Sequence, residues 1–323
     1  MNIVVSVILL IVSLALVIKG GDIFVSSATD IAKKAKIPQI IFGATIVSLA
    51  TTLPELIIGI ISSLDGTTGL AVGNAVGSAS CNIGLTCGIS FLLMKSDLSR
   101  GGFLKYYLNL FVIFVLTIFG FWFNLWLWQG FVLILLAILF FVVNYLDAKA
   151  LENTSSQKDK KQPKTKPVWL LILLFVLGAV LVGGGSYLLV QKVEELSGII
   201  GISEQFVGLT IIAIGTSLPE LITVFKALKA KSPYLAIGNI IGSNILNLTL
   251  ILGATRLSAW GYELQISPET AFISLPVLCV LSIFMIVPII IKRQTYRWQG
   301  LTMLAIYIAY IAVLVLNVVF KFI

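Results

Sequence analysis

The stretch GATIVSLATTLPELI at residues 43–57 recurs as GLTIIAIGTSLPELI at residues 208–222, which is 165 positions further along the chain. A second stretch repeats at the same offset: LAVGNAVGSASCNIGLTCG at 70–88 aligns without a gap to LAIGNIIGSNILNLTLILG at 235–253. Gly20 and Gly185 are related in the same way. Two long segments that recur at one offset indicate that the chain consists of two related halves.

The composition excludes a water-soluble enzyme. Of the 323 residues, 59% are hydrophobic and only 11% are charged, with a mean hydropathy of +1.07, whereas soluble proteins carry about 25% charged residues. There is no histidine, which removes histidine metal ligands and general bases. Cys81, Cys87 and Cys279 lie in apolar segments without a CxxC pattern, so we expect small core residues rather than a disulfide or zinc site.

Ten apolar runs are long enough to cross a bilayer, which takes about 20 residues. The first run lacks a basic leading region and a small-residue cleavage site, so we interpret it as a membrane span rather than a signal peptide. The predicted spans cover residues 2–24, 40–64, 68–94, 104–123, 126–147, 168–191, 205–228, 234–256, 269–291 and 298–320.

The basic residues predict the orientation. Of the 22 Lys and Arg residues that give the chain its formal charge of +8, 18 fall on alternate connections, so the positive-inside rule places both termini outside the cytoplasm. The polar stretch at 149–167 is then a cytoplasmic linker in a protein of the cell membrane. We interpret its charge as a solvated loop that sets the topology; binding to acidic lipid or a regulator is the alternative, and nucleic-acid binding is not expected. The stretch is too short and too basic for a regulatory calcium domain.

These observations predict an all-α polytopic membrane protein with ten transmembrane helices in a 5+5 inverted repeat. The first five-span unit covers residues 1–148 and contains the repeated segment 43–88; the second covers 168–323 and contains 208–253. Because each unit has an odd number of spans, the second enters the membrane upside down. Such pairs build binding sites near the bilayer midplane in secondary transporters.

Of the 14 acidic residues, only Glu55 and Glu220 lie deep within predicted spans. A carboxylate there costs about 2.5–3.5 kcal/mol unless a partner, a proton or a bound cation compensates, and no basic residue is predicted at that depth. Each glutamate follows a proline, Pro54 or Pro219, which removes a backbone donor from the helix. Carbonyls near residues 50, 51, 215 and 216 are thereby expected to face a cavity.

Carboxylate, hydroxyl, amide and carbonyl oxygens together make the ligand set that Ca2+ and Na+ prefer, and two glutamates match one Ca2+ in charge. The second repeated motif supplies small residues for close helix approach and amides for coordination. It comprises Gly73-Asn74, Gly77-Ser78 and Asn82, matched by Gly238-Asn239, Gly242-Ser243 and Asn247. The plainer interpretations are ordinary proline kinks and a small-residue packing face.

The paired motifs GATIVSLATTLPE with GNAVGSASCN, and GLTIIAIGTSLPE with GNIIGSNILN, resemble the two alpha repeats of the cation/calcium exchanger superfamily, specifically its prokaryotic sodium/calcium exchanger branch. The resemblance covers nearly the whole chain. It implies that Glu55 and Glu220 ligate Ca2+ and share in Na+ sites, and that spans 1 and 6 move, with Gly20 and the run 183–185 as a soft point.

The resemblance also implies roles for further residues. Thr51 and Thr216 would contribute carbonyls and hydroxyls around Ca2+, and Asn82 would line the middle of the site. Flanking sodium sites would use Thr52, Ser217, Ser78 and Ser243, with the carbonyls of Ala213 and Ser48. Asn247 stands where many such exchangers have Asp, which leaves the ion stoichiometry open and makes fewer Na+, or protons on the glutamates, conceivable. The differences Ala50/Gly215 and Ala79/Asn244 are expected to adjust helix packing.

We therefore expect a secondary active antiporter, not an enzyme, that exchanges Na+ for Ca2+ and has no organic cofactor. Its partners would be Ca2+, Na+ and the lipid bilayer; a monomer is conceivable, and the sequence leaves open whether K+, Mn2+ or Mg2+ is carried. The main alternative is a Ca2+/H+ antiporter that uses the same two glutamates as proton carriers. A passive channel and a membrane-embedded hydrolase are weaker alternatives, because the repeat is inverted and no nucleophile stands beside a recognisable base.

Overall fold

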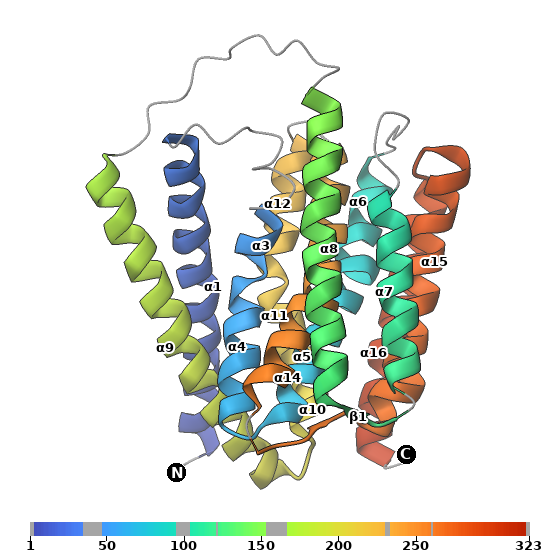
Figure 1. Cartoon of the computed structure of the whole chain (residues 1–323). Coiled ribbons are helices and arrows are strands. Elements are labelled where there is room, and N and C mark those ends of the chain that lie inside the picture. Colours follow the sequence, from blue (N-terminus) through green and yellow to red (C-terminus); the bar gives the residue numbers. More distant parts are fainter. Residues whose placement is uncertain are drawn as a thin grey trace.

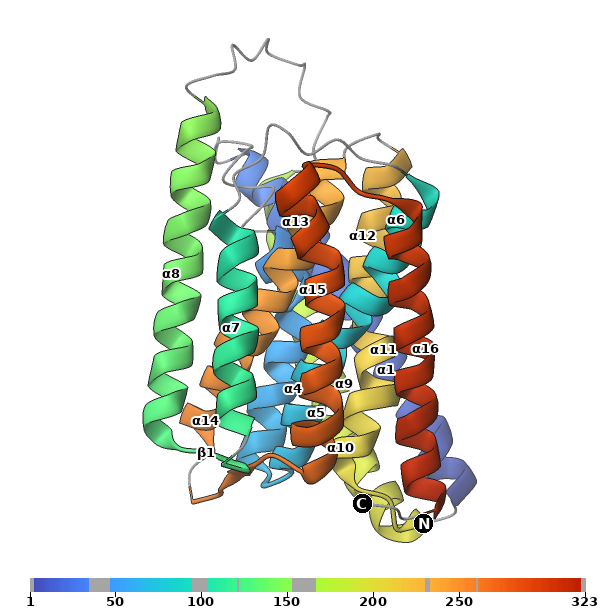
Figure 2. The ribbon, with the colours of Figure 1, turned by 90° about the vertical axis from the view of Figure 1, so that its right-hand side faces the viewer.

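The protein is a bundle of helices that run roughly along one common axis (Figure 1). The computed structural model describes residues 3–34, 47–94, 104–120, 122–152, 167–229, 233–259 and 261–320. Helix α1 begins and helix α16 ends at the same end of the bundle (Figures 1 and 2), which we call the terminal face.

The described elements are mostly helical, with π-helical turns marked η. In the first half of the chain they are α1 (Ile3–Lys34), α3 (Val47–Thr51), α4 (Leu53–Leu64), α5 (Thr68–Cys81), η2 (Asn82–Cys87), α6 (Gly88–Leu93), α7 (Leu104–Gly120), β1 (Asn124–Leu125) and α8 (Leu127–Glu152). In the second half they are α9 (Val168–Ile200), α10 (Glu204–Val207), η3 (Gly208–Ile212), α11 (Ala213–Thr216), α12 (Leu218–Lys229), α13 (Pro233–Leu246), η4 (Asn247–Ile251), α14 (Leu252–Ser258), β2 (Leu264–Gln265), η5 (Thr270–Ser274), α15 (Leu275–Lys292) and α16 (Arg297–Phe320).

The all-helical, membrane-spanning class is confirmed. Within the described residues, eight helical stretches are long and apolar enough to cross a membrane, and each coincides with a predicted span. The predicted spans 40–64 and 104–123 contain the shorter apolar helices Leu53–Leu64 and Leu104–Gly120, and residues 40–46 of the former span lie outside the described residues. Helix α8 extends to Glu152, so the first residues of the predicted linker are helical; residues 153–166 of that linker lie outside the described residues.

The helices that carry the second repeated motif form the centre of the bundle. In the most apolar part of the span Ala236–Ser258, 94% of the residues are buried, and in that of Thr68–Leu93, 78% are. In the corresponding parts of α1 and α9, only 22% of the residues are buried. Many large apolar side chains are exposed on the outside of the bundle, as expected for a surface that faces lipid. The small side chains of the repeated motif are therefore explained by their central place, where backbones approach closely.

Helices α1 and α9 pack against each other along their length at one side of the bundle (Figure 1). A Cβ added at Gly20 would lie 2.7 Å from the Leu181 Cβ, and one at Gly185 would lie 3.0 Å from the Leu16 Cβ. Both helices run without interruption through these glycines. Gly20 and Gly185 therefore lie in the contact between the two helices, and the soft point expected there stays a prediction.

A short antiparallel strand pair closes the terminal face. Strand β1 pairs with β2 in the register Asn124 to Gln265 and Leu125 to Leu264. The pair joins the segment before α8 to the segment before η5, so it ties the two halves of the chain together. The three cysteines are free; Cys81 and Cys87 are buried and Cys279 is half-buried, which agrees with core residues.

Candidate cation site

Two helix breaks place the glutamates. Between α3 and α4, Thr52 leaves the helical conformation with φ −89° and ψ 0°; between α11 and α12, Ser217 interrupts the helix with φ −79° and ψ 0°, still within the right-handed region. Pro54 and Pro219 follow each break by two residues, where a missing N–H is tolerated in a first helical turn. Glu55 and Glu220 consequently stand in the first turns of α4 and α12.

Both carboxylates are completely buried. Glu55 and Glu220 have 0% exposure, and in the described part of the chain they are the fully buried charged side chains. The two carboxylates are close enough to repel each other electrostatically. Thr216 lies beside the Glu55 carboxylate, while Thr51 and Ser243 lie beside that of Glu220. Each glutamate therefore lies beside a threonine hydroxyl from the other half of the chain, and Glu220 also lies beside Ser243 of its own half.

The hydroxyls that surround the glutamates meet in matching pairs. The Thr51 and Ser243 Oγ atoms are 3.5 Å apart, and those of Thr216 and Ser78 are 3.3 Å apart. Thr51 and Thr216 are equivalent positions in the repeat, and so are Ser78 and Ser243. Each pair therefore joins a threonine of one half to the serine of the other half. The Thr216 hydroxyl also donates to the Asn74 side-chain oxygen at 3.2 Å. The threonine of each half thus contacts the serine of the other.

Close backbone approach holds this arrangement together. A Cβ at Gly77 would lie 2.7 Å from both the Ala213 Cβ and the Leu209 carbonyl, and one at Gly242 would lie 2.4 Å from the Ser48 Oγ. Gly77 with Ala213 and Gly242 with Ser48 are again equivalent positions in the two halves. Only glycine permits α5 and α13 to approach the helix breaks of the opposite half so closely.

The carbonyls of Ser48 and Ala213 already accept hydrogen bonds around the breaks. The Ser48 carbonyl accepts from the Thr52 N–H at 3.1 Å and from the Thr52 and Thr51 hydroxyls at 2.9 and 3.2 Å. The Ala213 carbonyl accepts from the Ser217 N–H at 3.1 Å and from the Thr216 hydroxyl at 3.5 Å. A cation ligated by either carbonyl would compete with these hydroxyl donors.

Many buried polar atoms here have no hydrogen-bond partner among the described residues. They include all four carboxylate oxygens of Glu55 and Glu220, the Ser217 hydroxyl, and both side-chain polar atoms of Asn82, Asn239, Asn244 and Asn247. An unsatisfied buried polar group costs about 1–3 kcal/mol, so such a concentration calls for a ligand. Because the atoms are mostly oxygens that accept but do not donate, the ligand they suit is a cation.

Two π-helical turns mark the amide positions. η2 begins at Asn82 and η4 at Asn247, which are equivalent positions in the two halves. Isolated π-turns inside α-helices occur frequently at functional sites. The sequence predicted that the repeated motif, which includes Asn74 and Asn239, provides amides for coordination, whereas it predicted only a packing effect for Asn244. All three amides are buried, and Asn74 accepts a hydrogen bond from Thr216, so we add them to the candidate set.

The described residues contain no cluster of three or more His, Cys, Asp or Glu side chains that would hold a transition metal. The candidate site has instead two carboxylates among neutral hydroxyls and amides, which is typical of sites for Ca2+ and Na+.

Fold and composition together define a helical membrane protein that crosses the bilayer many times. Its family follows from comparison with known proteins. The sodium/calcium exchanger protein family model matches residues 5–146 and 170–316, so the chain belongs to the sodium/calcium exchanger family.

Individual relatives agree. The chain is 30% identical over 363 residues to the sodium/calcium exchanger MaX1 of Methanosarcina acetivorans, an alignment that covers 97% of this chain and 99% of the relative. It is 33% identical over 258 residues to the inner membrane protein YrbG of Escherichia coli, an alignment that covers 77% of this chain and 78% of YrbG. Solved structures of the sodium-calcium exchanger NCX_Mj superpose with a TM-score of 0.65 at 27% identity and cover 96% of this chain and 99% of theirs. The expected family is therefore confirmed.

Proposed function

We propose that this protein exchanges Na+ for Ca2+ across the cell membrane by alternating access, with Glu55 and Glu220 as the central ligands of both ions. The observation that carries the proposal is the pair of fully buried carboxylates, one from each half, that face each other without hydrogen-bond partners. The relatives MaX1 and NCX_Mj are both sodium/calcium exchangers, which supports the same ions.

Obligatory exchange follows from electrostatics. With neither ion bound, two bare carboxylates would have to cross the low-dielectric part of the protein when the site changes its facing, at a cost of several kcal/mol. One Ca2+, or Na+ ions in its place, removes that cost. The protein therefore moves its site from one side of the membrane to the other only when ions are bound. The Na+ gradient then drives Ca2+ in the opposite direction.

We further propose ten membrane helices in two inverted five-helix units, divided by the linker. The equivalent breaks at Thr52 and Ser217, the equivalent π-turns and the exchanged hydroxyl pairs support this symmetry. Helices α1 and α9 would move as one unit against the rest, because their glycines pack them tightly to each other while most of their surface faces outward.

The remaining ligand assignments are proposals as well. Thr51, Thr216 and Asn82 would complete the Ca2+ site, and the flanking Na+ sites would use Thr52, Ser217, Ser78, Ser243 and the carbonyls of Ser48 and Ala213. Asn247 provides an amide oxygen at the position equivalent to Asn82.

The decisive test is uptake of radioactive calcium into proteoliposomes driven by an outward Na+ gradient. We expect Glu55→Gln and Glu220→Gln each to lower the initial rate by about 100-fold, because losing about 3 kcal/mol of cation stabilisation corresponds to two factors of ten. Glu263→Gln, at an exposed position on the terminal face, is the matched control and should retain full activity. Full activity in either buried variant would refute the assignment.

A Ca2+/H+ antiporter is the second candidate, and it is favoured by one observation: Asn247 leaves the site with two carboxylates, which two protons would neutralise. Calcium uptake driven by a pH gradient in Na+-free medium would support it. Uptake that requires Na+ and is insensitive to a proton ionophore would support Na+ exchange.

A further inference from the structure

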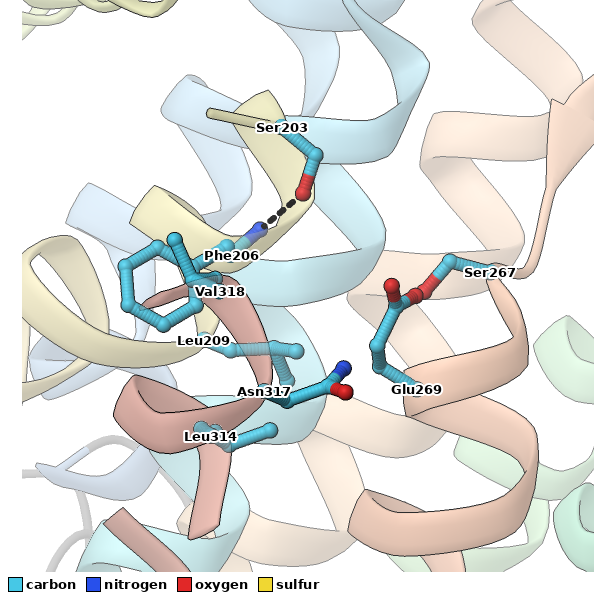
Figure 3. Close-up of a pocket in the computed structure, with 8 residues that line it drawn as sticks. All are labelled: Ser203, Phe206, Leu209, Ser267, Glu269, Leu314, Asn317 and Val318. Carbon is cyan, nitrogen blue, oxygen red and sulfur yellow. Dashed lines mark hydrogen bonds between the residues drawn. The ribbon is translucent and has the colours of Figure 1, made fainter. Parts of the chain in front are cut away.

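A small recess that is partly open to solvent lies at the terminal face, and neither central glutamate lines it. Its walls come from the start of α10, from η3, from the segment before η5, and from the end of α16 (Figure 3). The lining residues are Ser203, Phe206, Leu209, Ser267, Glu269, Leu314, Asn317 and Val318.

The recess contains an unpaired buried amide. Asn317 is 6% exposed, and its side-chain oxygen has no hydrogen-bond partner among the described residues. In Figure 3 this amide extends from α16 across the recess towards the Glu269 side. The last turns of α16 are otherwise apolar, so a lone asparagine on the buried face is costly unless its oxygen binds something.

Glu269 supplies a negative charge opposite. Its side chain is half-buried and lies next to Ser267 in Figure 3. The Glu269 carboxylate forms no ion pair or hydrogen bond with the described residues, although its backbone carbonyl accepts from Ser274 at 3.3 Å. A carboxylate, an amide oxygen and a serine hydroxyl therefore converge on one small space.

We propose that this recess binds a single Ca2+ ion from the medium, through the Glu269 carboxylate and the Asn317 amide oxygen, with water completing the shell. Ca2+ takes six to eight oxygen ligands in flexible geometry, whereas Mg2+ requires a near-ideal octahedron and loses water reluctantly. One carboxylate in a partly open site gives low affinity, of the order of 0.1–1 mM, as in extracellular calcium modules.

Binding here would affect the transport machinery through Leu209. This residue lines the recess, and its backbone is in contact distance of Gly73 and Gly77 on the central helix α5. A cation that joins α16 to the segment before η5 would stabilise the recess that Leu209 lines. The site does not use Glu55 or Glu220, so it stands independently of the transport proposal.

The test is the thermal stability of purified full-length protein in detergent as a function of Ca2+, in the double variant Glu55→Gln/Glu220→Gln, which lacks the central carboxylates. A ligand that binds the folded state raises the melting temperature in proportion to ln(1 + [L]/Kd). We expect the melting temperature to begin to rise at about 0.1–1 mM Ca2+ and to go on rising logarithmically above that concentration. Adding Glu269→Gln or Asn317→Leu should move the onset of this rise to at least tenfold higher Ca2+, while Glu263→Gln should leave the onset unchanged.

The same titration in protein with intact glutamates provides a second measurement if the double variant does not fold. There, Glu269→Gln should remove only the low-affinity component of Ca2+ binding. The proposal is overturned if the low-affinity component survives both Glu269→Gln and Asn317→Leu, or if Mg2+ produces the same stabilisation at the same concentration. If the parent protein shows this component but no Na+-driven calcium transport, the transport assignment alone is refuted.

Discussion

At the scale of single residues, charge decides what the buried site accepts. Two carboxylates, several hydroxyls and several amides lie in a region without a buried basic side chain among the described residues. The number of carboxylates sets how much positive charge the site can neutralise when cations leave water and enter it. Asn247 is the position at which this number is most open to change, because its amide is fully buried and unpaired.

Asn247→Asp would add a third carboxylate of nearly the same shape. We expect the concentration of Na+ needed for half-maximal Ca2+ release to fall by about tenfold, or 1.4 kcal/mol, and the Na+ Hill coefficient to rise, because the site then attracts more cationic charge. Calcium efflux from proteoliposomes at graded external Na+ measures both quantities.

The control for this substitution is Asn247→Leu, which removes the amide without adding charge and should only weaken transport. A lower Hill coefficient in Asn247→Asp than in the parent protein would contradict the electrostatic argument.

At the scale of helices, glycine contacts set the distance between the two halves. Gly242 and Gly77 place α13 and α5 directly against the broken helices of the opposite half. By contrast, Gly183 and Gly184 have nothing within 4 Å of an added Cβ. The same residue type therefore has a packing role in the centre and none at these two positions of α9.

Gly242→Ala should impair both folding and transport. The new methyl would lie 2.4 Å from the Ser48 Oγ and 2.9 Å from the Ser48 Cβ, so α13 and α3 must separate. We expect a destabilisation of about 1–3 kcal/mol, typical of overpacking, and a transport rate reduced to a small fraction. Thermal unfolding in detergent and calcium uptake measure the two effects.

Gly184→Ala is the matched control. It adds the same methyl group to a helix at a position with free space, and alanine favours helix by up to about 1 kcal/mol over glycine. Its melting temperature should be equal or higher. Equal effects of the two substitutions would show that the close contact at Gly242 does not matter.

Polar contacts near the terminal face link α9 to its neighbours. The Gln191 side-chain amide donates to the Asp65 carboxylate at 2.6 Å, and Glu195 accepts from Ser6 at 2.9 Å and from Lys192 at 2.6 Å. The first contact joins α9 to the turn after α4, while the Ser6 contact joins it to α1. A sliding motion of the α1 and α9 pair would therefore break the Gln191–Asp65 bond and keep the Ser6–Glu195 bond.

At the scale of the whole molecule, the orientation in the membrane determines which ions reach each opening. The terminal face carries both ends of the described chain and the strand pair, whereas the basic linker follows the opposite end of α8 (Figure 1). The positive-inside rule then predicts that the terminal face lies outside the cytoplasm.

Single-cysteine reporters test this orientation in a background without Cys81, Cys87 and Cys279. Glu263→Cys, exposed on the terminal face, should react with a membrane-impermeant maleimide in intact cells, whereas Ser156→Cys in the linker should react only after permeabilisation. The reverse pattern would invert the assigned topology, and transport activity of both variants provides the check on folding.

The sequence alone predicted the class of fold, the family, most of the membrane spans and the depth of the two glutamates. These features depend on apolar length, on a repeat offset and on proline positions, all of which are local properties of the chain. The pairing of Thr51 with Ser243 and of Thr216 with Ser78, the packing role of Gly20 and Gly185, and the recess at Asn317 were decided by the tertiary structure. Position in a helix gives the depth of a side chain but not its neighbour on the next helix, because that depends on how the helices cross and pack.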